Sequence, residues 1–415
     1  MSSKRIVLAV CTVLLLTAFP ARAQQFGPWS APVNLGAAVN SMCSDQHPAL
    51  SKDGLSLYFA SDRILDENNN VVSCAGAPNH LQLWVARRDC LDSADPACNW
   101  QRPEFLKINS APDPHVPSPF VDVAPNLSTD GHWLFFHSRR PGGCNTGHTA
   151  NGYFFELWAA RRQNNRDDQG WETPINLGCT LNIPETNEAG PSFWEDDSTS
   201  PPTLYLYINR DLLPNNLQAL GHCDPNAIHS GSPDSDVNGS CTDIYVSTCT
   251  ADLDTCNRQP AWSPAIYVPE LSSSVRDTRT AIRRRDGLEM ILTSSRCNSP
   301  IPPADLPLCS TLSTGGFDSW VSTRASAQDA WSIPIDINQD NLNKCNQLGI
   351  DLCPVVPVVD SSANDGAPAL SWDGQTLIFY SNRPGGSGGN DLYVSTRTKL
   401  CDSTTNTSCV ASLSQ

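Results

Sequence analysis

Apolar and polar residues alternate along short segments of this chain. Leu55, Leu57 and Phe59 recur at every second position, a period typical of a strand with one side toward a core. The dipeptide Asp53-Gly54 precedes them, and Asp-Gly favours a tight hairpin turn. Thirty-three prolines are spread through the 415 residues, and few runs favour a helix. The pattern therefore predicts an all-β protein built from short strands and turns.

The same pattern recurs five times, as three signatures in a fixed order. The first signature is a Trp-led segment, the second is a pair of β-like segments, and the third is a short apolar segment such as "LWVARR". The second signature reads "DQHPALSKDGLSLYFASDR" in the first copy and "DGAPALSWDGQTLIFYSNR" in the last. The copies lie about 70 to 90 residues apart and begin near 29, 100, 171, 262 and 331.

Each copy predicts four strands, and repeated four-stranded units that close on themselves are typical of a β-propeller. We therefore expect one domain, residues 24–415, with five blades. The chain starts with a Trp-led strand and ends after "DLYVSTR". The Trp29 segment should therefore form the outer strand of the last blade, which would leave no open sheet edge in the ring.

The second signature resembles the TolB-type β-propeller repeat, a WD-repeat-like family with the core P-x-x-S-x-D-G-x-x-L-x-F-x-S-x-R. Pro48–Arg63, Pro125–Arg140 and Pro368–Arg383 match it closely. The third copy loses the Asp-Gly turn and inserts "EDDSTSPP", and the fourth replaces the proline and the serine. The resemblance implies the propeller fold and says little about function.

The amino-terminal residues predict export. Lys4 and Arg5 precede an apolar run that ends at Ala21-Arg22-Ala23, which is the pattern of a signal peptide spanning residues 1–23. We therefore expect a periplasmic or secreted protein. The alternative is an uncleaved anchor, but the run is short for a membrane span.

Removal of that segment leaves an even number of cysteines, sixteen, which favours disulfides in an exported protein. No C-x-x-C pair occurs, which argues against a zinc ribbon or a redox motif. Pairing between neighbours would give these bonds, although sequence alone does not prove them: Cys43–Cys74, Cys90–Cys98, Cys144–Cys179, Cys223–Cys241, Cys249–Cys256, Cys297–Cys309, Cys345–Cys353 and Cys401–Cys409.

The formal net charge is −16. Such an acidic chain is poorly suited to nucleic acid or to an anionic lipid surface. We expect neither a nucleic-acid partner nor insertion into a membrane.

An arginine ends the second strand of each copy, and an acid begins the third strand in most of them. This spacing predicts an ion pair that ties the intervening loop to its blade. The predicted pairs are Arg140/Glu156, Arg210/Asp243, Arg296/Asp318 and Arg383/Asp391, with Gln82 opposite Arg63.

The long connections of the repeat should all open on one face of the ring, which we call the long-loop face. They are residues 64–81, 106–121, 141–155, 211–242, 297–317 and 338–364. Long loops on a rigid scaffold commonly carry binding sites. We therefore expect the functional site on this face, where the central channel opens.

One acid precedes the inner strand of every blade, and we call these five the acid ring: Asp45, Asp122, Glu188, Asp277 and Asp365. Three interpretations are open. Each acid could cap the turn into its strand, and its recurrence in every blade favours this. The ring could bind a cation or a polar ligand. Asp45, Asp122 and Glu188 could also act as catalytic acid and base on a glycoside.

A second candidate site lies in "DSDVNGSCTD". Asp234, Asp236 and Asn238, followed by Gly239, match a D-x-D-x-N-G calcium loop, and Asp243 could add a ligand. Alternating oxygen ligands suit calcium, but the helices and the final glutamate of an EF-hand are missing. The alternative is a polar surface loop held by Cys241. Calcium is therefore the one cofactor that the sequence suggests.

The remaining polar patterns are less specific. His47, His222 and His229 show no metal-ligand spacing. The segment "RDTRTAIRRRDG" gathers five arginines, Arg276, Arg279, Arg283, Arg284 and Arg285. It favours a solvated strand, with an anion-binding or docking surface as the alternative.

The leading functional hypothesis is an exported binding or scaffolding protein whose long-loop face takes a protein or glycan partner. The rival hypothesis is an enzyme, because five-bladed propellers include glycoside hydrolases with two aspartates and a glutamate where the channel opens. We name no glycosidase motif in the residues around Asp45, Asp122 and Glu188.

Overall fold

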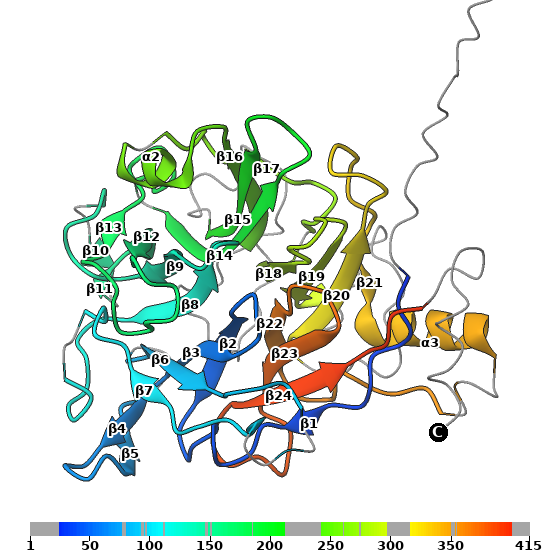
Figure 1. The fold of residues 1–415 in the computed structure, drawn as a ribbon, viewed down its shortest axis with the longest axis horizontal. Helices are drawn as coiled ribbons and strands as arrows, with labels where there is room; N and C mark the ends of the chain where they lie inside the picture. Colours follow the sequence, from blue (N-terminus) through cyan, green and yellow to red (C-terminus); the bar gives the residue numbers. More distant parts are fainter. Residues whose placement is uncertain are drawn as a thin grey trace, which may run out of the picture.

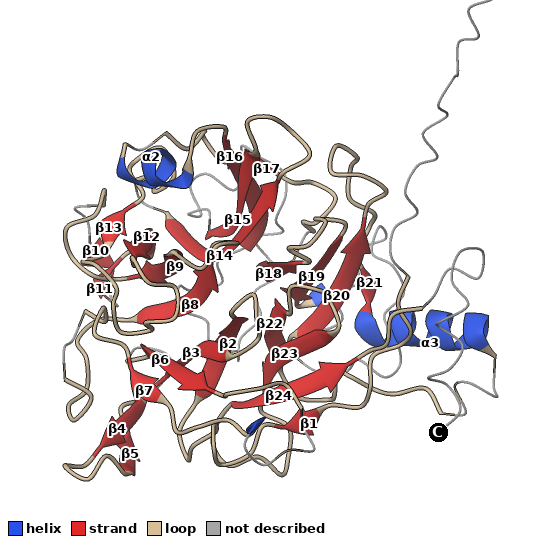
Figure 2. Cartoon of the chain, viewed as in Figure 1, coloured by secondary structure: helices blue, strands red, loops and turns tan. Residues whose placement is uncertain are grey.

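The computed structural model describes residues 25–400 except 77–79, 93–94, 96–97, 111–112, 146–147, 150–151, 185, 212–241, 260, 274, 297–315, 350–352 and 354. Five four-stranded antiparallel sheets stand around a central axis, as Figures 1 and 2 show. The predicted five-bladed, all-β propeller is therefore confirmed. The described residues contain two helices, α2 (Leu253–Arg258) and α3 (Ile337–Leu348).

The blades follow the repeats in order. Blade 1 contains β2 (Asp45–Leu50), β3 (Ser56–Ser61), β6 (Gln82–Arg87) and β7 (Glu104–Phe105). Blade 2 contains β8 (Asp122–Leu127), β9 (Trp133–Ser138), β12 (Glu156–Arg161) and β13 (Ile175–Asn176). Blade 3 contains β14 (Asn187–Asp196), β15 (Thr203–Asp211), β16 (Thr242–Cys249) and β17 (Ile266–Tyr267). Blade 4 contains β18 (Asp277–Ile282), β19 (Glu289–Ser294), β20 (Asp318–Thr323) and β21 (Ile335–Asp336).

Blade 5 joins the two ends of the chain. It contains β22 (Asp365–Leu370), β23 (Thr376–Ser381) and β24 (Asp391–Thr396), with β1 (Val33–Asn34) as the outer strand. Val33 pairs with Val394 and Asn34 with Tyr393. The predicted closure by the N-terminal strand is therefore confirmed. Two small hairpins lie outside the blades, β4 (Arg63–Leu65) with β5 (Val71–Cys74), and β10 (His148–Thr149) with β11 (Gly152–Tyr153).

The apolar core lies between neighbouring blades. Each of five buried clusters joins side chains of two adjacent sheets, such as Phe135 of blade 2 and Phe193 of blade 3, whose rings stack 5.3 Å apart. Burial of these faces against each other is the main driving force that holds the ring together.

The Trp-led signature has a specific packing role. The arginine that closes four of the repeats stacks on the tryptophan of the same blade, as Arg397 does on Trp29 at 4.1 Å. The other pairs are Arg88/Trp100, Arg162/Trp171 and Arg324/Trp331. Such cation–π contacts help to fix the outer strand against its blade. In blade 3, Cys249 stands in place of the arginine and forms a disulfide with Cys256.

The described residues contain five of the predicted disulfides: Cys43–Cys74, Cys90–Cys98, Cys144–Cys179, Cys249–Cys256 and Cys345–Cys353. The pairs 223–241, 297–309 and 401–409 lie outside the described residues, as does the predicted signal peptide. None of the described helices is long and apolar enough to cross a membrane.

Candidate functional site

The acid ring is buried inside the blades. Asp45 accepts hydrogen bonds from the backbone and the hydroxyl of Ser41, and it forms an ion pair with Arg63 at 2.5 Å. The other four acids repeat this arrangement, each with an arginine and a serine or threonine of its own blade: Asp122 with Arg140 and Ser110, Glu188 with Arg210 and Thr186, Asp277 with Arg296 and Ser273, and Asp365 with Arg383 and Ser361. All five are fully buried. These contacts are those of the capping interpretation, and ligand binding by the acid ring stays a prediction.

These contacts also correct the predicted ion pairs. Each arginine at the end of a second strand bonds the acid of the first strand, not the acid that begins the third strand. The prediction was wrong because the first and second strands are adjacent and antiparallel, so Asp45 lies directly opposite Ser61. The arginine two residues further on reaches back to that acid.

The acids that begin the third strands in blades 5 and 2 hold the loops by accepting hydrogen bonds from the loop backbone. Asp391 accepts hydrogen bonds from the backbone N–H groups of Ser387 and Gly388, and from the amide of Asn34 at 2.9 Å. A Cβ on Gly386 would overlap the Asp391 carboxylate. The glycines of "RPGGSGG" therefore let a loop wrap around an acid. Glu156 of blade 2 is held in the same way by residues 144–145.

Every inner strand carries a β-bulge two residues after its acid. The bulged residue has a positive φ between 46° and 58° in all five blades: His47, Ala124, Gly190, Arg279 and Ala367. A left-handed conformation is costly for residues other than glycine and is often found at functional positions. These five residues line the half of the central channel nearer the long-loop face, a space that we call the loop-side hollow, which is partly open to solvent and offers ≈ 30 Å³ to the centre of a water-sized sphere.

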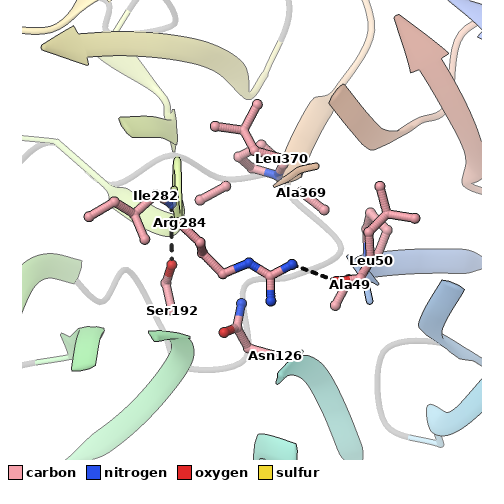
Figure 3. Close-up of a pocket in the computed structure, with 11 residues that line it drawn as sticks. Ala49, Leu50, Asn126, Ser192, Ile282, Arg284, Ala369 and Leu370 are labelled. Atoms are coloured by element: carbon pink, nitrogen blue, oxygen red, sulfur yellow. Dashed lines mark hydrogen bonds between the residues drawn. The ribbon is translucent and has the colours of Figure 1, made fainter. Parts of the chain in front are cut away.

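Arg284 lies in the opposite half of the channel, where it lines a second pocket of similar size (Figure 3). Its guanidinium donates to the carbonyl oxygen of Leu50 at 2.8 Å, as Figure 3 shows, and to that of Leu127 at 3.1 Å. It thereby joins blade 4 to blades 1 and 2, and burial lowers its pKa to about 10. Arg283 is also buried and bonds Glu289. The expectation of a solvated arginine strand was therefore wrong at these two positions, whereas Arg285 is exposed.

Two buried histidines and one arginine stand at the loop-side hollow. His47 and Arg279 line it directly, from blades 1 and 4. His137 of β9 accepts a hydrogen bond at Nδ1 from the backbone N–H of Gly190, 3.2 Å away. We call His47, His137 and Arg279 the channel cluster. Sequence reasoning missed it because the three residues come from three blades and share no spacing.

The pKa values of both histidines in the channel cluster are lowered. Burial and the charge of Arg279 lower the pKa of His47 well below its usual value. Burial lowers the pKa of His137 in the same way, with smaller contributions from Arg279, His47 and Arg139. Both imidazoles are therefore neutral at pH 7.

The predicted calcium loop lies outside the described residues, except for Asp243. The Asp243 side chain is buried at the start of β16, and burial together with the neighbouring Asp277 raises its pKa to about 8. Within the described residues, the groups of three metal-ligand side chains that lie close together both include a disulfide. Calcium binding therefore stays a prediction.

Comparison with known proteins identifies structures of similar fold but does not identify a family. No protein-family model matches the chain, and no curated protein matches it. The TolB-type resemblance therefore stays a prediction.

The comparison finds solved structures with a similar fold, including the following three. The levansucrase from Gluconacetobacter diazotrophicus matches with a TM-score of 0.50 at 10% identity, over 92% of this chain and 85% of that one. The alpha-L-arabinofuranosidase from Lactobacillus brevis has a TM-score of 0.47 at 14% identity, with 89% and 95% covered. The GH43_1 enzyme from Xanthomonas citri complexed with xylotriose has a TM-score of 0.42 at 15% identity, with 90% and 91% covered. At these identities the similarity concerns the propeller fold alone.

Proposed function

We propose that the protein is an exported binding module that takes a glycan on its long-loop face, above the loop-side hollow. The observation that carries this proposal is the asymmetry of the channel: the long loops surround the end that holds the loop-side hollow, whereas Arg284 bridges blades 1, 2 and 4 and lines a second pocket toward the Asp-Gly turns. A concave site on a rigid ring is the usual form of a ligand site.

The loops around the hollow are anchored, which supports binding. The Cys43–Cys74 disulfide ties β5 to the segment before β2, and the backbone of Leu65 donates to the carbonyl of Pro114 at 3.1 Å. This second contact joins the β4–β5 hairpin to the loop at 106–121. Anchored loops lose little conformational entropy when a partner binds.

Exposed apolar side chains lie on these same segments. Met42, Val72 and Val116 are each more than half exposed. Apolar contacts flanked by polar groups suit the faces of sugar rings, and exposed apolar residues that gather on one face commonly mark an interaction site.

The decisive experiment is binding of a neutral and acidic oligosaccharide panel by the oxidised mature protein, residues 24–415. We expect Val72→Asp to weaken glycan binding at least tenfold, because it places a charge on the contact surface. Ile266→Asp is the matched control, since Ile266 is also more than half exposed but lies on the outer strand β17. Absence of binding to every glycan, or equal loss in both variants, would reject the proposal.

A second candidate function is glycoside hydrolysis, and one residue favours it. Burial raises the pKa of Glu188 to about 7 although Arg210 opposes the shift. Within the described residues, Glu188 Oε2 has no hydrogen-bond partner. A protonated glutamate near pH 7 is the form that a general acid requires. Asp45 and Asp122 are the candidates for the second carboxylate.

Hydrolysis is tested by the release of reducing sugar from arabinan, xylan and levan. Activity that falls at least a hundredfold in Glu188→Gln, while the variant keeps the melting temperature of the wild type, would favour the enzyme. No release above the buffer blank would leave the binding module as the function.

A further inference from the structure

The channel cluster presents nitrogen atoms to a small space. His47 and Arg279 line the loop-side hollow from opposite sides of the ring. Arg279 also lies beside Gly190, since a Cβ placed on that glycine would be 3.4 Å from Arg279 Nη1. His137 contacts the backbone of the same glycine. Gly190 is therefore the point at which the three blades bring these side chains together.

The hydrogen bond to His137 fixes the position of its proton. Because Nδ1 accepts from the Gly190 N–H, the neutral imidazole carries its proton on Nε2. His137 is fully buried, and among the described residues that Nε2–H has no acceptor. Leaving a buried donor unpaired is unfavourable, because the group loses its hydrogen bonds to water and gains none in the protein. Such a donor calls for a bound water or an ion.

A ring nitrogen of His47, near His137, is in a similar environment. The side chain is 3% exposed, and its Nδ1 has no hydrogen-bond partner within the described part of the chain. Its ring packs edge-on against Tyr380, 5.9 Å away. Two buried imidazoles thus share one region with a guanidinium.

The charges around the hollow are positive. The charged groups that act on the two imidazoles are Arg279 and, for His137, also Arg139. The nearest carboxylates along the chain, those of the acid ring, bond the arginines of their own blades. A cation would be repelled by Arg279, whereas an anion would gain both the charge and the N–H donor.

We propose that the loop-side hollow is a binding site for a small anion, a carboxylate or an inorganic ion of similar size, held by Arg279 and by a ring N–H of His47, which both line it, with His137 buried behind Gly190. The hollow offers ≈ 30 Å³ to the centre of a water-sized sphere, and about 10–15 Å³ of such volume holds one water molecule. The hollow therefore accommodates one small group. This inference stands whether or not the long-loop face binds a glycan.

The anion has two sources, a free ion or the carboxylate of a larger molecule that docks on the long-loop face. Titrations with chloride, acetate and glucuronate separate them. Glucuronate that binds at least tenfold more tightly than acetate indicates a ligand carboxylate. Equal or weaker binding of glucuronate indicates a free ion.

The test is a calorimetric titration and a thermal-shift series on the mature oxidised protein, with the ionic strength held constant by a bulky sulfonate buffer. We expect saturable binding with a rise in melting temperature, because an anion that binds only the folded state stabilises it. Arg279→Gln should raise the Kd at least tenfold. Arg285→Gln, which removes the same charge from an exposed position in the Asp-Gly turn, should leave the Kd unchanged.

Arg279→Lys controls for misfolding of Arg279→Gln. It keeps the positive charge but loses the planar donor geometry. It should bind the anion more weakly than the wild type and more tightly than Arg279→Gln. No saturable anion effect in the wild type would mean that the hollow holds water only. That outcome, or an equal loss in Arg279→Gln and Arg285→Gln, would overturn the proposal.

Discussion

The acid ring and the channel cluster both place ionisable groups in the interior of the ring, but they differ in repetition. Each carboxylate of the acid ring bonds an arginine of its own blade, five times over. Each residue of the channel cluster occurs in one blade only: where His47 and Arg279 stand, the other three blades have alanine or glycine. A polar group that recurs in every blade stabilises the fold. A polar residue that occurs in one blade only is a better candidate for a specific function.

The same contrast separates blade 5 from blade 4. In blade 5, Asn34 donates to Asp391 at 2.9 Å, and Asn40 donates to Asn34 at 2.9 Å. Asn40 also pairs with both the N–H and the carbonyl of Leu392. One acid and two amides thus form a chain in which donors and acceptors alternate. Blade 2 repeats it with Glu156, Asn176 and Asn182.

In blade 4 all three positions are aspartates. Asp318 begins the third strand, Asp336 stands in the outer strand, and Asp360 accepts from the N–H of Ser319 at 2.6 Å. The two amide donors of blades 2 and 5 are missing. Burial, then the charges of Asp336 and Asp365, raise the pKa of Asp318 to about 8. Burial and the neighbouring aspartates raise the pKa of Asp360 well above its usual value.

The largest expected effect comes from breaking a repeated pair. Asp45→Asn leaves the buried guanidinium of Arg63 without its carboxylate, which should destabilise the protein by about 3–5 kcal/mol. Equilibrium unfolding in urea measures this change. The exposed Asp329→Asn is the control. A loss below about 1 kcal/mol would show that the pairs are not what holds the inner strands.

A smaller loss should follow from a change in the repeated loop. Gly386→Ala forces a methyl group into the Asp391 carboxylate, and loosening those loop hydrogen bonds should cost about 1–3 kcal/mol. Gly389→Ala in the same loop meets only ordinary contacts, 3.8 Å from Ser44, and should be nearly neutral. Equal melting temperatures for the two variants would contradict the loop geometry.

A gain should follow when blade 4 is made to match blade 5. Because burial raises the folded-state pKa of Asp318 and Asp360 above the unfolded value of about 3.9, the native state favours the protonated carboxyls. The contribution of these two groups to stability should therefore be greatest at low pH and should decline as the pH rises toward and through about 8.

Asp360→Asn restores an amide donor and removes one titrating group. We expect it to stabilise the protein at pH 8 by about 1–2 kcal/mol, a net value for one restored hydrogen bond, and to flatten the decline. Melting temperatures from pH 5 to 9 test this. A variant that is less stable than the wild type at pH 8 would contradict this account, in which the three aspartates of blade 4 lack the amide donors that blade 5 supplies.

The sequence predicts much of this molecule because its architecture is repetitive. The alternation in "LSLYFAS" and the recurring Trp segments predict the blades, and the N-terminal Trp strand predicts the closure that β1 and β24 form. Close spacing predicts the Cys43–Cys74 bond and four others. These features depend on residues that lie near each other along the chain or on exact repetition.

The rest depends on contacts that the sequence does not display. The partner of Arg140 is Asp122 of the first strand, whereas spacing alone pointed to Glu156. His47 and Arg279 are far apart in the sequence, and the β-bulges of two separate blades bring them to one hollow, with His137 of a third blade beside them. Arg284 reads as a surface charge, yet it is buried in the channel and bridges three blades.

The most direct test of the central claim, that the channel is a site and the acid ring is architecture, is a crystal structure of the mature protein soaked in bromide. The account predicts an anomalous peak in the loop-side hollow, within hydrogen-bond distance of Arg279 and His47, which line it. Bromide confined to the outer surface, with water in the hollow, would contradict it.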